Sequence, residues 1–505
     1  MNPFIKRHQE LINGTLSCFD RVVLTGTLPD ICYAGAMAGY LGYHKIRIFD
    51  YPKWANQLRE ELHTHAEQLA DQAGLAIEFI RSYKSFRKEA RIKDILEQRG
   101  NHPGLVHIFS AMETCTAYRP WHDKKTHKTS LKTTQGKCLH YYFYFIDEDF
   151  GLCYLRLPTW APFRLQVYFN GHSWLACHLD RSAIGYQMID NAFLSIQDPE
   201  SAQALADSLE ATQLHRHLDR WAAAYCPVAS RFRNHYHWSF MQVEYATDVV
   251  FRSQCEFQPL YENIVRSAAV DVKADQIATF LGRKLVGQYR DEVGNNFSTR
   301  IQGTRIRHSM GSNSIKLYDK FGLIARVECT SNDVSSFKHR RKVEQRNGDT
   351  VTRNAPLRKT IYSLKTLRKL MGAANQRYLA YMASIEHPGS GQQACDKLAR
   401  SAKEKHRSYR GFNLFQQEDF QIFITLMRGE WAISGFRARD LRKHISQLTP
   451  SRSSYLIKRL RTHGIIKKVG RCYKYYLTKF GRNVVATVLK LKQELIVPSL
   501  CKTAA

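Results

Sequence analysis

A helix with clearly marked ends, near residue 450, constrains the fold of this chain more than any other feature. Thr449 is a good helix cap and Pro450 suits the first helical position, so the sequence predicts a helix that begins there. Leu456 and Leu460 belong to one apolar stripe, and Gly464 ends the helix. Such a helix can bury one face and leave its other faces exposed.

Two predicted helices come before it and two short strands follow it. The earlier helices cover residues 419–428 and 437–445, and the strands lie around a basic glycine turn within residues 465–478. This order resembles MarR-type and related winged-helix families, in which the third helix enters the major groove of DNA and the strand pair lies along the backbone. The resemblance implies a DNA-binding winged helix at the carboxyl end.

The resemblance also implies which side chains meet DNA. Arg452 and Ser453, near the start of the third helix, are the candidates for contacts to base edges. The other candidates are basic residues of the helix and the strand pair, and the strand-pair residues are expected at phosphates: Lys458, Arg459, Arg461, Lys467, Lys468, Arg471 and Lys474. A winged helix that contacts only protein is the alternative.

Positive charge is concentrated in two segments of a chain whose net charge is +30. Residues 400–505 hold 23 basic and 6 acidic residues, and residues 337–371 hold 11 and 2. A polyphosphate backbone rewards such concentration because each neutralised phosphate releases counterions. We therefore expect DNA as the partner, with RNA as a weaker alternative, and we add Arg340, Arg341 and Lys342 to the nucleic-acid candidates.

Several classes of protein do not fit the sequence. No apolar stretch is long enough for a membrane span, no amphipathic helix carries bulky apolar anchors, and the first residues lack a secretion signal, so we expect a cytoplasmic protein with no membrane partner. The 12 cysteines show no metal or disulfide spacing. No Gly-Lys-Ser or Gly-Lys-Thr loop occurs, so no nucleotide cofactor is expected.

The sequence predicts an α+β multidomain protein with mixed and antiparallel sheets upstream of the C-terminal winged helix-turn-helix. Helical spacing covers residues 54–73, and three strands between residues 138 and 169 read as an antiparallel meander. Residues 118–137 are expected to be an exposed loop. The predicted regions are an N-terminal α+β region over residues 1–230, a central α+β region over 231–386, a linker over 387–416 and the winged helix over 417–497.

The central region contains a second informative pattern, in which a strand ending in Tyr-Asp-Lys is followed by a strand with Arg-x-Glu. This pattern resembles the strand-turn-strand of replication initiators of the filamentous-phage and rolling-circle plasmid type. An upstream strand with two acidic residues resembles the first strand of that fold. The matching residues are Tyr318, Asp319, Lys320, Arg326, Glu328, Glu244 and Asp248.

Initiators of that type cut one DNA strand with a tyrosine and a divalent ion, so the resemblance implies a nicking site. A helical pair of tyrosines would supply the nucleophile, a lysine would neutralise the phosphate, and two alternating strand histidines with a glutamate would hold Mg²⁺ or Mn²⁺. Core packing for the tyrosines and a solvated strand end for the histidines are the alternatives. The candidates are Tyr378 and Tyr381, Lys320, and His235, His237 and Glu328.

We therefore expect a DNA-binding protein of replication-initiator or transposition type, with metal-dependent nicking by a tyrosine as an open hypothesis. A non-catalytic winged-helix regulator is the main alternative. An RNA-binding protein is a third, because aromatic strands such as the one from Tyr141 to Phe145 would be able to stack bases. The complete chain also resembles large bacterial proteins, which favours a mobile-element setting.

Overall fold

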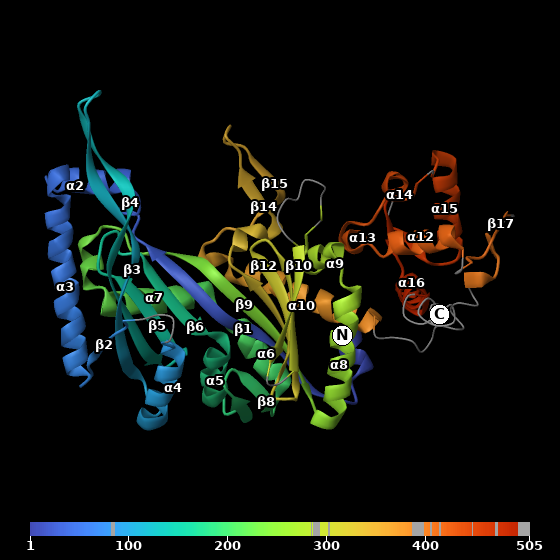
Figure 1. The fold of residues 1–505 in the computed structure, drawn as a ribbon, viewed down its shortest axis with the longest axis horizontal. Helices are drawn as coiled ribbons and strands as arrows, with labels where there is room; N and C mark the ends of the chain where they lie inside the picture. The colour runs from blue at the N-terminus through green and yellow to red at the C-terminus, as the bar shows by residue number, and fades with distance from the viewer. Residues whose placement is uncertain are drawn as a thin grey trace, which may run out of the picture. The chain divides into compact units, whose positions relative to one another are not determined.

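The chain is a mixed α/β protein with a large mixed sheet in a computed structural model of its 505 residues (Figure 1). It divides into two compact units whose segments alternate along the sequence. The first unit contains Met1–Thr15, Thr247–Cys329 and Leu370–Ala505, and the second contains Leu16–Ala246 and Thr330–Lys369. The structure describes residues 1–81, 86–283, 285, 293–300, 303–385, 398–404, 407–413, 416–446, 448–469 and 473–492.

The second unit is built on strands in the order β9-β1-β6-β5-β4-β3-β2. Strands β3 to β6 pair antiparallel in sequence order, and β2 pairs parallel to β3. The predicted meander between residues 138 and 169 is therefore confirmed. The strands are β1 (Ile12–Thr27), β2 (Ile77–Phe79), β3 (Gly104–Asp123), β4 (Lys128–Asp147), β5 (Gly151–Pro158), β6 (Leu165–Asn170) and β9 (His237–Phe251), with separate pairs β7 (Tyr186–Ile189) and β8 (Ala192–Ile196), and β14 (Lys338–Glu344) and β15 (Thr350–Pro356).

The helices of the second unit cover the sheet. The predicted helix over residues 54–73 is present as α3, and Asp198 caps α6 by accepting from the N–H groups of Glu200 and Ser201. The helices are α2 (Ala34–Tyr43), α3 (Tyr51–Gln72), α4 (Lys88–Arg99), α5 (Gly171–Arg181), α6 (Pro199–Ser208) and α7 (Ala211–Tyr225), with short 3-10 turns η1 (Ile48–Asp50), η2 (Pro227–Arg231), η3 (Val334–Ser336) and η4 (Ile361–Ser363).

The aromatic strand β4 is buried on both faces. Tyr142 and Tyr144 pack in a cluster with Ile92 of α4, while Phe143 and Phe145 lie against Tyr225 and Trp221 of α7. Alternate side chains of a strand point to opposite faces, so two covered faces explain an aromatic run without alternation. The rings from Tyr141 to Phe145 are all less than a tenth exposed. The expectation that they stack on RNA bases is therefore wrong.

The first unit contains the strand order β10-β11-β12-β13-β9 and the carboxyl-terminal helices. Strands β10 to β12 pair antiparallel in sequence order. The strands are β10 (Val293–Arg300), β11 (Gly303–Met310), β12 (Asn313–Lys320), β13 (Ile324–Ser331), β16 (Ala402–Glu404), β17 (Arg407–Tyr409), β18 (Ile466–Lys468) and β19 (Tyr475–Leu477). The helices are α1 (Pro3–Arg7), α8 (Gln254–Asp271), α9 (Ala274–Phe280), α10 (Leu364–Ile385), α12 (Gln417–Leu426), α13 (Gly429–Ser434), α14 (Ala438–His444), α15 (Pro450–Thr462) and α16 (Lys479–Lys490).

Within the described part of the chain, no helix combines the length and the apolar character needed to cross a membrane. The described end of the predicted linker is also structured. Leu398 and Phe412 are buried in the core that carries α12 to α16, and β16 and β17 between them form an antiparallel pair. The carboxyl-terminal core thus begins before residue 417, whereas residues 387–397 lie outside the described residues.

Two residues of the initiator-like pattern form a buried ion pair in the first unit. The Arg326 side chain is 0% exposed and donates from Nε to Asp248 Oδ1 at 2.6 Å and from Nη2 to Oδ2 at 2.7 Å. Bidentate geometry makes this one of the stronger kinds of side-chain interaction. It joins β13 to β9 in the middle of the sheet.

Removing only one partner of this pair should destabilise the chain strongly. We expect Arg326→Met to lower the free energy of unfolding by about 3–5 kcal/mol, because Asp248 is left as a buried unpaired charge. The double change Arg326→Met/Asp248→Leu should recover most of that loss. Urea unfolding of the three proteins tests this, and equal midpoints for the single and double variants would contradict it.

Candidate nucleic-acid interface

Helix α15 begins and ends where the sequence predicts. The Thr449 hydroxyl accepts the N–H of Arg452, Pro450 occupies the first turn, and Gly464 follows the helix with φ of +70°. Leu456 and Leu460 are buried in the core shared with α12, α13, α14 and α16. An antiparallel strand pair, β18 with β19, follows α15 as expected, but a short helix that the sequence did not predict, α13, lies between α12 and α14.

Three of the five α15 candidates lie on exposed faces. Arg452, Lys458 and Arg461 are exposed, so their charged groups are open to solvent. Ser453, in contrast, is 0% exposed and its hydroxyl donates to the Pro450 carbonyl and accepts from Arg442. Ser453 therefore serves the helix start and cannot reach a base edge, which corrects that expectation.

Arg459 is also buried, and it holds the domain together. Its guanidinium forms two hydrogen bonds with Asp419 on α12, at 2.8 and 2.9 Å, and donates to the carbonyls of Arg410 and Gly411. The ring centroid of Phe412 lies 3.8 Å from the guanidinium carbon. Each of the three guanidinium nitrogens donates to a partner inside the protein, so Arg459 is a structural residue and not a DNA contact.

The strand pair β18–β19 adds further positive charge beside α15. Lys467 and Lys468 are exposed, Lys474 is half-buried, and Lys468 Nζ lies 4.8 Å from the ring centroid of the exposed Tyr473. Arg471 lies outside the described residues. Phe436 forms a bridge to Tyr475 through two backbone hydrogen bonds of 2.9 Å, which anchors the inner strand.

In the second unit, the predicted basic segment forms the hairpin β14–β15 around the Asn347-Gly348 turn. Arg340 and Lys342 are exposed and Arg341 is half-buried, with its Nε donating to the Pro356 carbonyl. These cations are therefore presented on a two-stranded ribbon.

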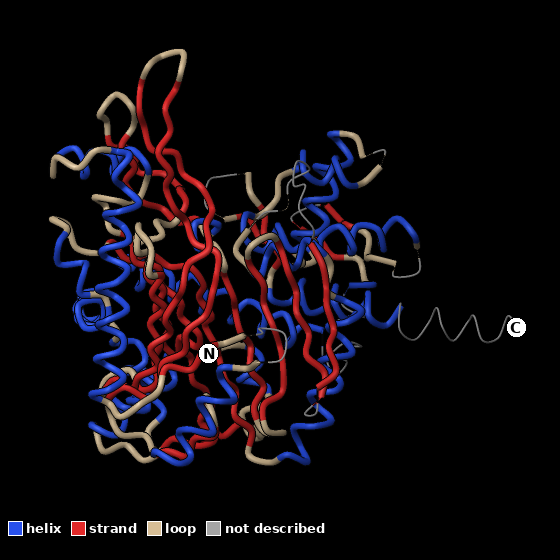
Figure 2. Tube along the Cα trace, turned by 60° about the vertical axis from the view of Figure 1, so that its left-hand side comes forward, coloured by secondary structure: helices blue, strands red, loops and turns tan. Residues whose placement is uncertain are grey.

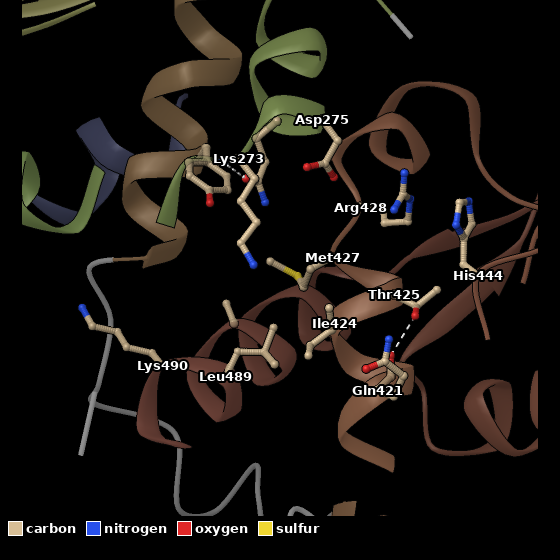
Figure 3. A pocket seen from close by; sticks show the side chains of 13 residues that line it. Lys273, Asp275, Gln421, Ile424, Thr425, Met427, Arg428, His444, Leu489 and Lys490 are labelled. Carbon is tan, nitrogen blue, oxygen red and sulfur yellow. Dashed lines mark hydrogen bonds between the residues drawn. The ribbon is translucent and has the colours of Figure 1, made fainter. Parts of the chain in front are cut away.

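A cavity of about 200 Å³ lies in the first unit among α9, α10, α12 and α16 (Figure 3). Lys273, Arg428 and Lys490 line it from three different elements, together with His444 and Asp275. Asp275 Oδ2 accepts the N–H of Gly429 at 2.8 Å. Among its described lining residues, the cavity thus holds three cations and one carboxylate, Asp275, which already accepts a backbone N–H.

The two candidate nucleophiles have different surroundings. Tyr378 is 0% exposed and its hydroxyl lies 3.0 Å from His308 Nε2, and burial raises the pKa of this phenol well above its ordinary value. A hydroxyl enclosed in this way cannot approach a phosphate, so the structure gives Tyr378 a place in the core. Tyr381, one turn further along α10, is half-buried and lines the cavity of Figure 3.

The predicted metal ligands are divided between the two units. His235 and His237 are both exposed and alternate with buried Tyr236 and Trp238, but only His237 belongs to a strand, because β9 begins there. Neither histidine belongs to any metal-compatible group of side chains among the described residues. Glu328 belongs to the other unit, is 2% exposed, and binds Lys316 Nζ at 2.5 Å and the Tyr318 hydroxyl at 2.7 Å.

Lys320, the candidate for neutralising a phosphate, is half-buried at the end of β12, with Nζ 5.2 Å from the Phe321 ring centroid.

One acidic group with metal-compatible spacing, Asp147, Asp149 and His217, occurs in the second unit. Burial would raise the pKa of Asp147, but hydrogen bonds, first from His217 and then from the Asp149 N–H and Trp221, hold it below its ordinary value. Because these groups already donate to Asp147, we interpret Asp147, Asp149 and His217 as a structural hydrogen-bond network.

Asp319, a residue of the Tyr-Asp-Lys pattern to which the sequence analysis gave no role of its own, is a buried carboxyl. Its side chain is 4% exposed, and neither oxygen has a hydrogen-bond partner of good geometry among the described residues. Burial raises the pKa of Asp319 to about 6, and the N–H of Gly322 offsets part of that rise. The charged form is therefore disfavoured in the folded protein.

Comparison with known proteins adds one distant similarity. No protein-family model matches the chain, and no curated protein matches it. Among solved structures, it is similar to a rolling circle replication initiator protein from Geobacillus stearothermophilus, with 10% sequence identity and a TM-score of 0.19. The similarity covers 71% of this chain and 97% of that one. A similarity this low transfers no role to this chain.

The Arg459–Asp419 pair should be needed for folding of the carboxyl-terminal core. We expect Arg459→Gln to lower the unfolding free energy by about 3–5 kcal/mol, because Asp419 loses its partner inside the protein. The nearby exposed change Arg461→Gln should stay within about 0.5 kcal/mol of the parent. Denaturant unfolding, with hydrogen exchange in α12 and α15 as a local readout, tests this, and equal stability of the two variants would refute it.

Asp319 should make the stability depend on pH. The pKa of Asp319 is higher in the folded than in the unfolded protein, so the folded state binds the proton more tightly. Proton binding therefore stabilises the fold at low pH, and this stabilisation is lost as the pH rises from about 4 to about 6. We expect Asp319→Asn to flatten the stability profile over that window and to increase stability at pH 7 by about 1–3 kcal/mol. Thermal melts across the pH range measure both effects, and a loss of stability at pH 7 would contradict this account.

Proposed function

We propose that this protein binds duplex DNA through helix α15 and the strand pair β18–β19, which act together as a winged helix. The observation that carries the proposal is the composition of this segment. Residues 450–478 contain eight basic residues and no acidic residue. The apolar stripe of α15 faces the core, so Arg452, Lys458 and Arg461 are left for an external partner.

The shape of this segment suits a groove. An α-helix fits the major groove of B-DNA, and a short basic strand pair beside it can follow the phosphates. Arg452, one turn into α15, is the residue we propose for base contacts, and Lys458, Arg461, Lys467 and Lys468 are proposed for the backbone. The helix is held rigidly, because Arg459 and Ser453 direct their polar groups inward. A fixed helix loses less entropy when it binds.

The proposal concerns binding and assigns no reaction. Tyr378 is enclosed, and the carboxylate of Glu328 is engaged by Lys316 and Tyr318. The arrangement therefore favours the DNA-binding regulator of the sequence analysis over strand nicking. A role in RNA binding loses its main support, because the β4 rings are buried.

Removing three exposed cations of α15 should weaken DNA binding. We expect Arg452→Ala/Lys458→Ala/Arg461→Ala to bind a labelled random-sequence duplex about 100-fold less tightly, and to lower the slope of log affinity against log salt by about 2–3. Alanine is a good helix former, so α15 should remain folded. Fluorescence anisotropy at several KCl concentrations measures both quantities.

A control variant removes the same number of exposed cations elsewhere. Lys53→Ala/Arg87→Ala/Lys93→Ala changes three exposed residues of the second unit and should keep the parent affinity and slope. The proposal fails if the α15 variant and this control bind DNA equally well.

A further inference from the structure

Residues predicted to form a loop instead extend the strands β3 and β4 into a long two-stranded ribbon. Pairing continues without interruption from Met112 opposite Leu139 to Asp123 opposite Lys128, whereas the pairing of β4 with β5 ends at His140. The ribbon projects beyond α2 and α3 of the same unit in Figure 1, and Figure 2 shows a strand pair that ends in a short turn at the highest point of the chain. Its base is held by the Tyr118 hydroxyl, which donates to the Ile31 carbonyl at 2.7 Å.

The projecting part is strongly basic. Residues 119–137 contain six basic residues and one acidic residue. All six basic side chains are exposed: Arg119, Lys124, Lys125, Lys128, Lys132 and Lys137. Because directly opposed residues of an antiparallel pair share a face, Arg119, Lys132 and Lys128 lie on one side of the ribbon.

The arrangement of these cations is unfavourable for an isolated protein. Arg119 and Lys132 are directly opposite one another, and like charges in that position destabilise a strand pair. Both cations lie near Trp121, whose ring centroid is 3.8 Å from Lys132 Nζ and 5.7 Å from the Arg119 guanidinium carbon. The ring therefore holds two cations close together at an exposed site. An anionic partner would relieve their repulsion.

We propose that the β3–β4 ribbon is a second DNA-binding surface, which contacts the phosphates of a duplex. The five pairs from Arg119–Lys132 to Asp123–Lys128 extend about 17 Å at the rise of an antiparallel strand. The major groove of B-DNA admits a two-stranded ribbon and is only about 8.5 Å deep, whereas the major groove of an RNA duplex is too narrow. Lys132 covers the Trp121 ring, which favours contacts to phosphates over stacking on single-stranded bases.

The second basic ribbon of this unit supports the same surface. The tips of β3–β4 and β14–β15 point in the same direction in Figure 1, and both hairpins belong to the second unit. Residues 338–359 contain eight basic and two acidic residues. Two projecting ribbons of one charge on one end of a unit present a broad cationic surface to a polyanion.

The test uses the full chain and the variant Lys124→Ala/Lys125→Ala/Lys128→Ala. We expect it to bind the labelled duplex about tenfold less tightly, and to lower the salt slope by up to about 2–3. The control Lys53→Ala/Arg87→Ala/Lys93→Ala should match the parent. The three lysines lie at an exposed turn, so the melting midpoint should be unchanged. As a second readout, duplex DNA should change part of the tryptophan emission of the parent, and this part should be missing in Trp121→Phe.

The outcomes separate this surface from the proposed function of α15. A ribbon variant with parent affinity and slope overturns the inference and leaves the α15 proposal standing. Loss of binding in the ribbon variant, with no effect of the α15 variant, supports the ribbon and overturns the proposed function. If the ribbon variant loses binding only to phosphatidylserine vesicles and not to DNA, the inference is also overturned.

Discussion

A chain with a net charge of +30 can fold only if each cation that enters its interior meets an acceptor there. The structure shows this constraint in both units. Arg326 pairs with Asp248, Arg459 with Asp419, and in the second unit Arg156 pairs with Glu113. Each pair joins elements that are far apart in the sequence. Each of these carboxylates thus lies where a guanidinium group that leaves water needs an acceptor.

This use of carboxylates has a consequence for the surface. A carboxylate that pairs with a buried arginine is not available to an exposed lysine, and residues 450–478 and 119–137 contain no acidic residue and one acidic residue of their own, so both segments stay strongly cationic. Exposed charges repel one another only weakly in water with salt, so the folded chain tolerates them. These exposed cations increase the affinity for a polyanion, because its condensed counterions are released when it binds. The same constraint therefore serves both folding and binding.

The sequence predicted local structure well where one residue type determines the backbone. Thr449, Pro450 and Gly464 mark the ends of α15 because a cap, a fixed φ and a left-handed φ are local requirements. The Asn347-Gly348 turn joins β14 to β15 for the same reason. The meander of β4 to β6 was also predicted, because turn residues separate three apolar runs.

The candidate site was harder to predict, because burial depends on partners that are distant in sequence. Arg459 and Arg461 are both basic residues at the end of one helix, but only Arg459 meets Asp419, 40 residues earlier. Tyr378 is enclosed and Tyr381 lines a cavity, although the two are three residues apart on one helix. The ribbon of residues 118–137 was read as a loop because its polar side chains carry no apolar alternation. Backbone pairing between β3 and β4 forms this ribbon, and such pairing leaves no apolar pattern in the sequence.

The two cationic surfaces have different physical characters, and this bears on how one chain would use them. Helix α15 is backed by an apolar core, so its backbone is held in place, as the proposed contacts of Arg452 to base edges would require. Among the described residues, the projecting part of the β3–β4 ribbon, between Met112 and Leu139, pairs with no third strand. Its lysines carry their charge on flexible side chains, which suit phosphates of any sequence. If both contact one duplex, the second contact is intramolecular and strengthens binding without adding specificity. Sequence preference would then come from α15 alone, and salt sensitivity from both surfaces together.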